Sequence, residues 1–112
     1  MSVALTIPQV LNESKDVTRR IGWWFLNVGD RIQLCEKCMG LKPGRSLVKL
    51  KVVEVVNTWP ERLDSISEHD VSREGFPNMT SAEFVAMFCK SMKVDPWKLV
   101  NRIEFKYLKG AS

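Results

Sequence analysis

The longest run of strand-forming residues, LVKLKVVEVVNTW at residues 47–59, most constrains how this chain can fold. Apolar and β-branched residues alternate with lysines along its first half, which predicts a long strand. The alternation places Val48, Leu50 and Val52 on the expected buried face, with deeper burial from Val55 onward. The run therefore predicts that a sheet organises the fold.

Three further segments have strand character. VTRRIGWWFL at residues 17–26 is rich in β-branched and aromatic residues and is expected to be extended. A Gly-Asp turn precedes RIQLC, where Ile32 and Leu34 are expected to share one face. The segment NRIEFKYL at residues 101–108 alternates apolar and charged residues and predicts a closing strand.

Helix signals are confined to two parts of the chain. Pro8 can open a short helical turn, because a first helical position tolerates its missing N–H. Ser67 and Gly75 mark the start and stop of a second short helix. Thr80 with Glu83 forms a capping box, which predicts the start of the clearest helix. The apolar residues of that helix fall at helical spacing at Phe84, Met87, Phe88 and Met92.

The order of strands, then short helices, then a final strand predicts an α+β fold that is mostly β. We expect a small curled β-barrel, with short helices covering it. The chain length of 112 residues favours one domain spanning residues 1–112. No apolar run approaches the roughly 20 residues that span a bilayer, and the N-terminus does not resemble a signal peptide. The default expectation is a soluble, cytoplasmic protein with no membrane partner.

Positive charge is concentrated in the first half of the chain. Residues 1–53 carry nine Lys and Arg against four Asp and Glu, whereas residues 54–112 carry eight against nine. This distribution favours a phosphate-bearing partner on the first half, although scattered solubilising charge accounts for it equally well. Three cysteines in a chain of this kind argue against a disulfide framework.

The motif CEKC suggests zinc, but a four-ligand site needs partners, and only Cys89 and His69 remain. Cys89 lies beside the apolar face of the predicted helix, as a buried thiol does. On a strand, Cys35 and Cys38 point to opposite sides. We therefore expect no metal and no other cofactor.

An ordered set of segments resembles the ASCH domain family of the PUA-like superfamily, with small phage and bacterial members nearest. The set runs from about Lys15 to Leu108 and comprises KDVTRR, VGDRIQL, SISEHDVSREGF, MTSAEF and VNRIEFKYL. The resemblance implies a PUA-like β-barrel with a cleft on one side that binds RNA or handles nucleotides. Some small bacterial members hydrolyse the acetyl amide of N4-acetylcytidine, and others are described as ribonucleases.

The resemblance also implies roles for three residues. Lys15 and Thr18 match a Lys-x-x-Thr motif, and Glu74 matches a catalytic glutamate. In amide hydrolysis Thr18 would be the nucleophile, Lys15 the base and Glu74 a general acid/base. Around this glutamate the chain departs from the family, because His69 lies one place early and Gly75 follows directly. Without the resemblance, these three residues are ordinary strand and surface residues.

Two pairs of adjacent residues add candidate ligand contacts. Arg19 and Arg20 alternate sides on a strand, so one can grip a phosphate or base while the other faces solvent or a carboxylate. Trp23 and Trp24 alternate likewise, one filling the core and the other offering a stacking platform. The loop residues Lys37, Lys42 and Arg45 either extend a phosphate-binding rim or are solvated charges.

The leading hypothesis is a domain that binds RNA or a modified nucleoside in a basic cleft. The second is a hydrolase of the same fold, acting on N4-acetylcytidine or as a ribonuclease. The third is a protein-interaction module that uses its loops. The sequence predicts neither the preferred ligand nor the oligomeric state.

Overall fold

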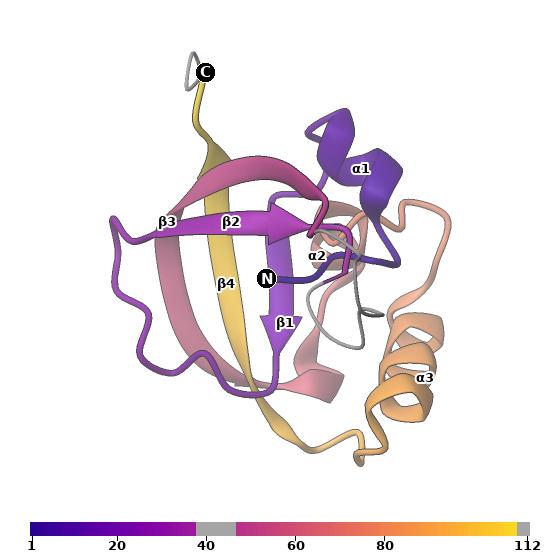
Figure 1. Cartoon of the computed structure of the whole chain (residues 1–112). Helices are drawn as coiled ribbons and strands as arrows, with labels where there is room; N and C mark the ends of the chain where they lie inside the picture. The colour runs from indigo at the N-terminus through magenta and orange to yellow at the C-terminus, as the bar shows by residue number, and fades with distance from the viewer. Residues whose placement is uncertain (38–46, 110–112) are drawn as a thin grey trace.

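A computed structural model describes residues 1–37 and 47–109 of the chain. Its centre is one four-stranded antiparallel sheet in the order β1-β4-β3-β2. The sheet curls into a half-barrel, with helices at one side (Figure 1). In chain order the elements are α1 (Ile7–Leu11), β1 (Val17–Arg20), β2 (Arg31–Cys35), β3 (Lys49–Arg62), a 3-10 turn η1 (Leu63–Ser65), α2 (Glu68–Arg73), α3 (Ser81–Met92) and β4 (Leu99–Tyr107).

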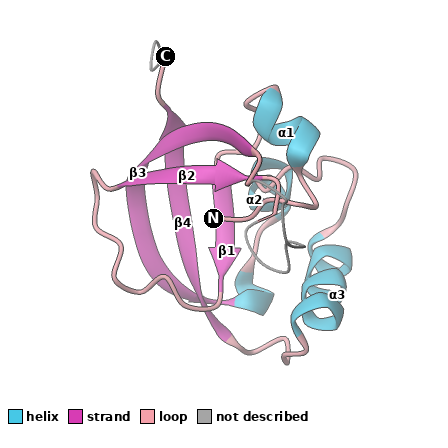
Figure 2. Ribbon diagram, viewed as in Figure 1, coloured by secondary structure: helices cyan, strands magenta, loops and turns pink. Residues whose placement is uncertain are grey.

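The curl follows from β3, which is long and interrupted by two bulges. Lys51 pairs with Leu34 and Lys49 with Cys35, so Leu50 is an extra residue. A second shift leaves Val56 extra against β4. Bulges bend a strand and increase its twist, and Figure 2 shows β3 arching across the sheet.

The first bulge also corrects the predicted buried face of β3. An extra residue resets the alternation of side chains, so Val53 and Val55 point into the core. Val48 was expected inside but is 49% exposed. The long strand was correctly predicted, but its buried face was not.

One apolar core fills the concave side of the sheet. It includes Ile32, Leu34, Val53, Ile103 and Phe105, and the predicted inward faces of β2 and β4 are confirmed. The N-terminal segment covers part of the open side, where residues 1–3 hydrogen-bond to the backbone of β2. Figure 1 shows the N-terminus between β1 and β2.

A second core lies between the sheet and the helices. Val100 of β4 is not part of the first core. It packs in the second core with Leu63, Val71 and Phe84. The predicted starts of α2 and α3 are confirmed, because Ser67 Oγ accepts from the N–H of Asp70, and the capping box of α3 is complete. The caps thus fix where α2 and α3 begin.

The tryptophan pair was wrongly predicted to be extended. β1 ends at Arg20, and Gly22 and Trp23 both have positive φ, 98° and 59°. Trp23 and Trp24 therefore belong to a turn rather than alternating across a strand. Within the described residues, no helix is long and apolar enough to cross a membrane.

Candidate functional site

The candidate site is built around the short helix α2, which faces the outer side of β1 and β4. Asp70 and Glu74 are four residues apart, so their carboxylates lie on the same face of the helix. Glu74 is the last residue before Gly75, whose φ of 110° ends the helix. The Gln9 side chain of α1 donates to the Gly75 carbonyl at 3.0 Å, which fixes this helix end.

Lys15 and Glu74 form a buried ion pair. Lys15 Nζ lies 2.9 Å from Glu74 Oε1 and donates to the Glu74 carbonyl at 2.7 Å. Their side chains are both 4% exposed. Burial lowers the pKa of the Lys15 ammonium, although the Glu74 carboxylate opposes this effect. Glu74 thus holds the Lys15 ammonium in place, and burial makes that ammonium easier to deprotonate.

The backbone of Lys15 is also fixed. The Tyr107 hydroxyl donates to the Lys15 carbonyl, and burial raises the pKa of that hydroxyl, which keeps its proton. Next to it, the Asp16 N–H donates to the Arg73 carbonyl at 3.0 Å. The entry to β1 is therefore tied both to β4 and to α2.

Arg19 links the ion pair to a larger charge cluster. Its guanidinium contacts Glu74 at 3.2 Å, Asp70 at 2.6 Å and Glu61 at 2.8 Å. Arg102 contacts Asp70 with two nitrogens, at 2.7 and 3.1 Å. Hydrogen bonds from Arg102, and then from Arg19, hold the pKa of Asp70 well below its ordinary range.

Thr18 and Arg20 lie together on the opposite face of β1. Thr18 is directly opposite Ile103 of the concave core, and it is 3% exposed. Arg20 Nε donates to Thr18 Oγ1 at 3.1 Å. A guanidinium donating to a hydroxyl oxygen stabilises negative charge that develops there.

Both faces of β1 meet at one cavity, which we call the inner cavity. Among the described strands, β1 is the outermost one on this side of the sheet, and its edge borders the cavity. The volume is about 380 Å³. Its polar wall contains Lys15, Thr18, Arg19, Arg20 and Glu74, and its apolar wall contains Phe76, Phe84, Met87 and Phe88.

The remaining predicted site residues are placed as follows. Trp23 lines the inner cavity and also a second, more open cavity beside β2, whereas Trp24 is exposed and lines neither. Lys37 is exposed and also lines neither. Lys42 and Arg45 lie outside the described residues, as does Cys38 of the CEKC motif.

Three residues of the charge cluster were missed by the sequence reasoning: Asp70, Glu61 and Arg102. Asp70 lies in the predicted second helix and Arg102 among the alternating charges of the predicted last strand, but neither was expected at a site. The signal for Asp70 was its four-residue spacing from Glu74 on a helix that also buries Val71. Arg102 is opposite Arg19 in the sheet, and a sequence does not reveal this register.

Comparison with protein-family models, curated proteins and solved structures finds no significant match for the chain. The chemistry of the inner cavity therefore has to be inferred from its own residues.

Proposed function

We propose that the inner cavity binds a modified pyrimidine nucleoside, in a domain with the PUA-like fold of the ASCH family. The observation that carries the proposal is the convergence of Lys15, Thr18 and Glu74 on one cavity. They lie up to 59 positions apart in the chain, yet all three are at most 3% exposed and line the same wall. The curled sheet with short flanking helices agrees with such a domain.

The size and the walls of the cavity suit one nucleoside. Small-molecule sites are mostly apolar hollows of roughly 300–1,000 Å³ with a few placed polar groups. Here Phe76, Phe84 and Phe88 offer aromatic surface to a base. Arg20, on the polar wall, suits a carbonyl or phosphate oxygen. A duplex is far too wide for this space, so a single nucleotide unit is the natural occupant.

A second function, hydrolysis of the acetyl amide of N4-acetylcytidine, is favoured by one specific observation. Lys15 has a lowered pKa and touches Glu74, and Thr18 accepts a hydrogen bond from Arg20. In this scheme Lys15 acts as a neutral amine and takes the proton of the Thr18 hydroxyl as that oxygen attacks the acetyl carbon. The C–N bond breaks and cytidine leaves with that proton on its amine. Water then hydrolyses the threonine ester, which releases acetate and restores the hydroxyl.

The ribonuclease alternative gains less from the cavity. General acid–base cleavage of RNA most often uses histidine. The one histidine of the chain, His69, is exposed and lines neither cavity. Nucleoside binding or amide hydrolysis thus fits the residues of the inner cavity better than ribonuclease activity does.

Binding is tested by calorimetric titration of cytidine and N4-acetylcytidine into the wild type and into Lys15→Met. The wild type should bind at least one nucleoside, and Lys15→Met should weaken binding at least tenfold. Lys51→Met is the matched control, because Lys51 pairs with Glu13 at 3.3 Å and lines neither cavity. Absence of binding to the wild type would refute the proposal and favour a protein-interaction module.

Hydrolysis is tested separately, by chromatography of N4-acetylcytidine after incubation with the protein. Release of cytidine that is lost in Thr18→Val identifies an amidohydrolase. Valine keeps the shape of threonine, and losing the hydrogen bond from the Arg20 guanidinium costs about 1.5–3 kcal/mol of stability. Binding without release by the wild type identifies a binding domain instead.

A further inference from the structure

A second cavity, which we call the outer cavity, adjoins the inner one. Its volume is about 570 Å³, and it opens widely to solvent. Trp23 lines both cavities, so the two spaces share this residue as part of their walls. The outer cavity continues past Phe25 and along β2, where it is bordered by Arg31, Gln33 and Lys49.

The loop that separates the cavities is held in an unusual conformation. Trp23 has a φ of 59°, a region in which a tryptophan is strained by roughly 1–3 kcal/mol. The strain is offset by Asn101, whose side-chain amide donates to the Trp23 carbonyl at 2.9 Å. Asn101 is only 2% exposed, and its side-chain oxygen Oδ1 accepts from the Thr58 hydroxyl at 2.6 Å. Leu26, 8% exposed, anchors the other end of the loop in the core.

This anchoring displays an aromatic side chain to solvent. Phe25 is 71% exposed, yet its ring lies 5.5 Å from the ring of Trp23. A fixed and exposed aromatic ring beside a cavity is a ready surface for stacking a base. Core packing does not explain Phe25, because most of its surface remains in water.

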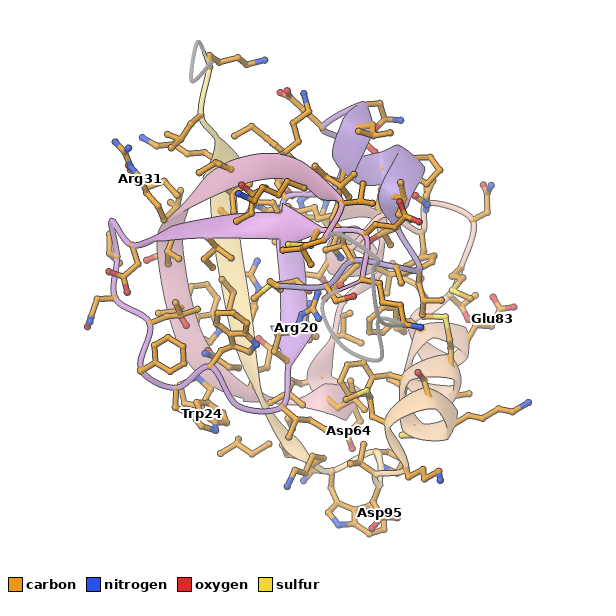
Figure 3. The ribbon with its side chains drawn as sticks, viewed as in Figure 1. Arg20, Trp24, Arg31, Asp64, Glu83 and Asp95 are labelled. Carbon is orange, nitrogen blue, oxygen red and sulfur yellow. The ribbon has the colours of Figure 1, made fainter. Side chains whose placement is uncertain are left out.

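The charges bordering the outer cavity agree with a phosphate-bearing occupant. Arg31 and Lys49 are both exposed there. Asp30, the one acid among the described residues of the wall, already accepts from the Asn27 N–H at 2.8 Å. Figure 3 shows Arg31 projecting outward from the start of β2. With Arg20 in the inner cavity, cations thus border both spaces on either side of Trp23.

We propose that the outer cavity binds the neighbouring nucleotide of a single-stranded RNA whose modified nucleoside occupies the inner cavity. The inference rests on the proposed function of the inner cavity. The base of the neighbouring nucleotide stacks on Phe25, and the phosphate of that nucleotide faces Arg31 and Lys49. The protein would thus act on a nucleoside within a strand rather than on a free nucleoside.

The test compares two probes, free N4-acetylcytidine and the RNA pentamer UU-ac4C-UU, by fluorescence or calorimetric titration. The wild type should bind the pentamer more tightly than the nucleoside, with an affinity that falls as salt rises. Phe25→Ala should weaken binding of the pentamer roughly five- to hundredfold and leave the affinity for the free nucleoside unchanged. Arg31→Gln should reduce the salt dependence.

Trp24→Ala is the matched control. Trp24 belongs to the same loop and is 53% exposed, but it lines neither cavity, and Figure 3 shows it at the rim of the molecule. It should leave pentamer affinity within twofold of wild type. Nucleoside binding without tighter pentamer binding, or equal losses in Phe25→Ala and Trp24→Ala, overturns this inference alone. Failure to bind either probe overturns the proposed function as well.

Discussion

Replacing Glu74 by Gln tests the buried ion pair most sharply. Gln keeps the shape of the side chain and an oxygen that accepts hydrogen bonds, but it removes the negative charge. Arg19 retains Asp70 and Glu61 as partners. In the described part of the chain, Lys15 keeps the carbonyl of residue 74 and an amide oxygen as acceptors, but it loses its carboxylate partner. The change therefore isolates the charge that compensates Lys15.

The cost can be bounded from both sides. Removing one partner of a buried ion pair typically destabilises a protein by about 3–5 kcal/mol. Lys15 can escape part of this penalty by losing its proton. From its ordinary pKa of 10.5 this costs at most about 5 kcal/mol at pH 7, at about 1.36 kcal/mol per pH unit. We expect a loss of about 3–5 kcal/mol in the free energy of unfolding at pH 7.

The loss should shrink as pH rises. Burial lowers the pKa of Lys15 in the folded state, and losing the Glu74 charge lowers it further. The folded protein then binds fewer protons than the unfolded chain, so stability increases with pH up to about 10.5. Urea unfolding followed by tryptophan fluorescence, from neutral to alkaline pH, measures this dependence.

Two variants control the interpretation. Lys15→Met combined with Glu74→Gln should recover more than half of the loss, because no unpaired charge remains buried. Glu54→Gln breaks the partly exposed pair with Lys106, at 3.4 Å, and should cost less than about 1 kcal/mol. A cost below about 1 kcal/mol for Glu74→Gln, or no recovery in the double variant, would refute the pairing described above.

Three further changes test the frame around the site. Gly75→Ala should cost about 1–3 kcal/mol, because its φ is positive and a Cβ would lie 3.1 Å from Gln9 Cγ; an unchanged urea midpoint would contradict this. Thr80→Ala should cost about 1 kcal/mol through loss of the capping box, measured in the same way. Asp70, whose pKa is held low by Arg102, should stabilise the fold above pH 3.8 and lose this effect as pH falls further; acid unfolding of Asp70→Asn should lack this component.

The sequence predicted those parts of the fold that depend on local chemistry. The caps at Ser67 and Thr80, the long strand around residues 49–62 and the inward face of β4 all follow from neighbouring residues. In each case the signal and the structure it specifies lie within one element. The α+β class followed from the order of these elements.

The errors have long-range causes. The turn at Trp23 depends on Asn101, a residue 78 positions away that satisfies its carbonyl. The face of β3 changed because of a bulge at Leu50 that no local signal marked. Local propensity favours an extended chain at both places, and tertiary contacts override it.

The candidate site shows the same division. Lys15, Thr18 and Glu74 were selected through a resemblance, and the structure brings them to one cavity. Asp70 and Arg102, which help hold Arg19 in place, depend on helix packing and strand register. Neither can be read from a single sequence, although the four-residue spacing of the two carboxylates on α2 was a usable signal.

The central claim is that a nucleoside binds between the polar edge of β1 and the aromatic wall of α3. The most direct measurement is an NMR titration of ¹⁵N-labelled protein with N4-acetylcytidine. The largest amide shifts are predicted at residues 15–20, 74–76 and 84–88. No shifts at millimolar nucleoside, or shifts confined to residues outside these ranges, would contradict the claim.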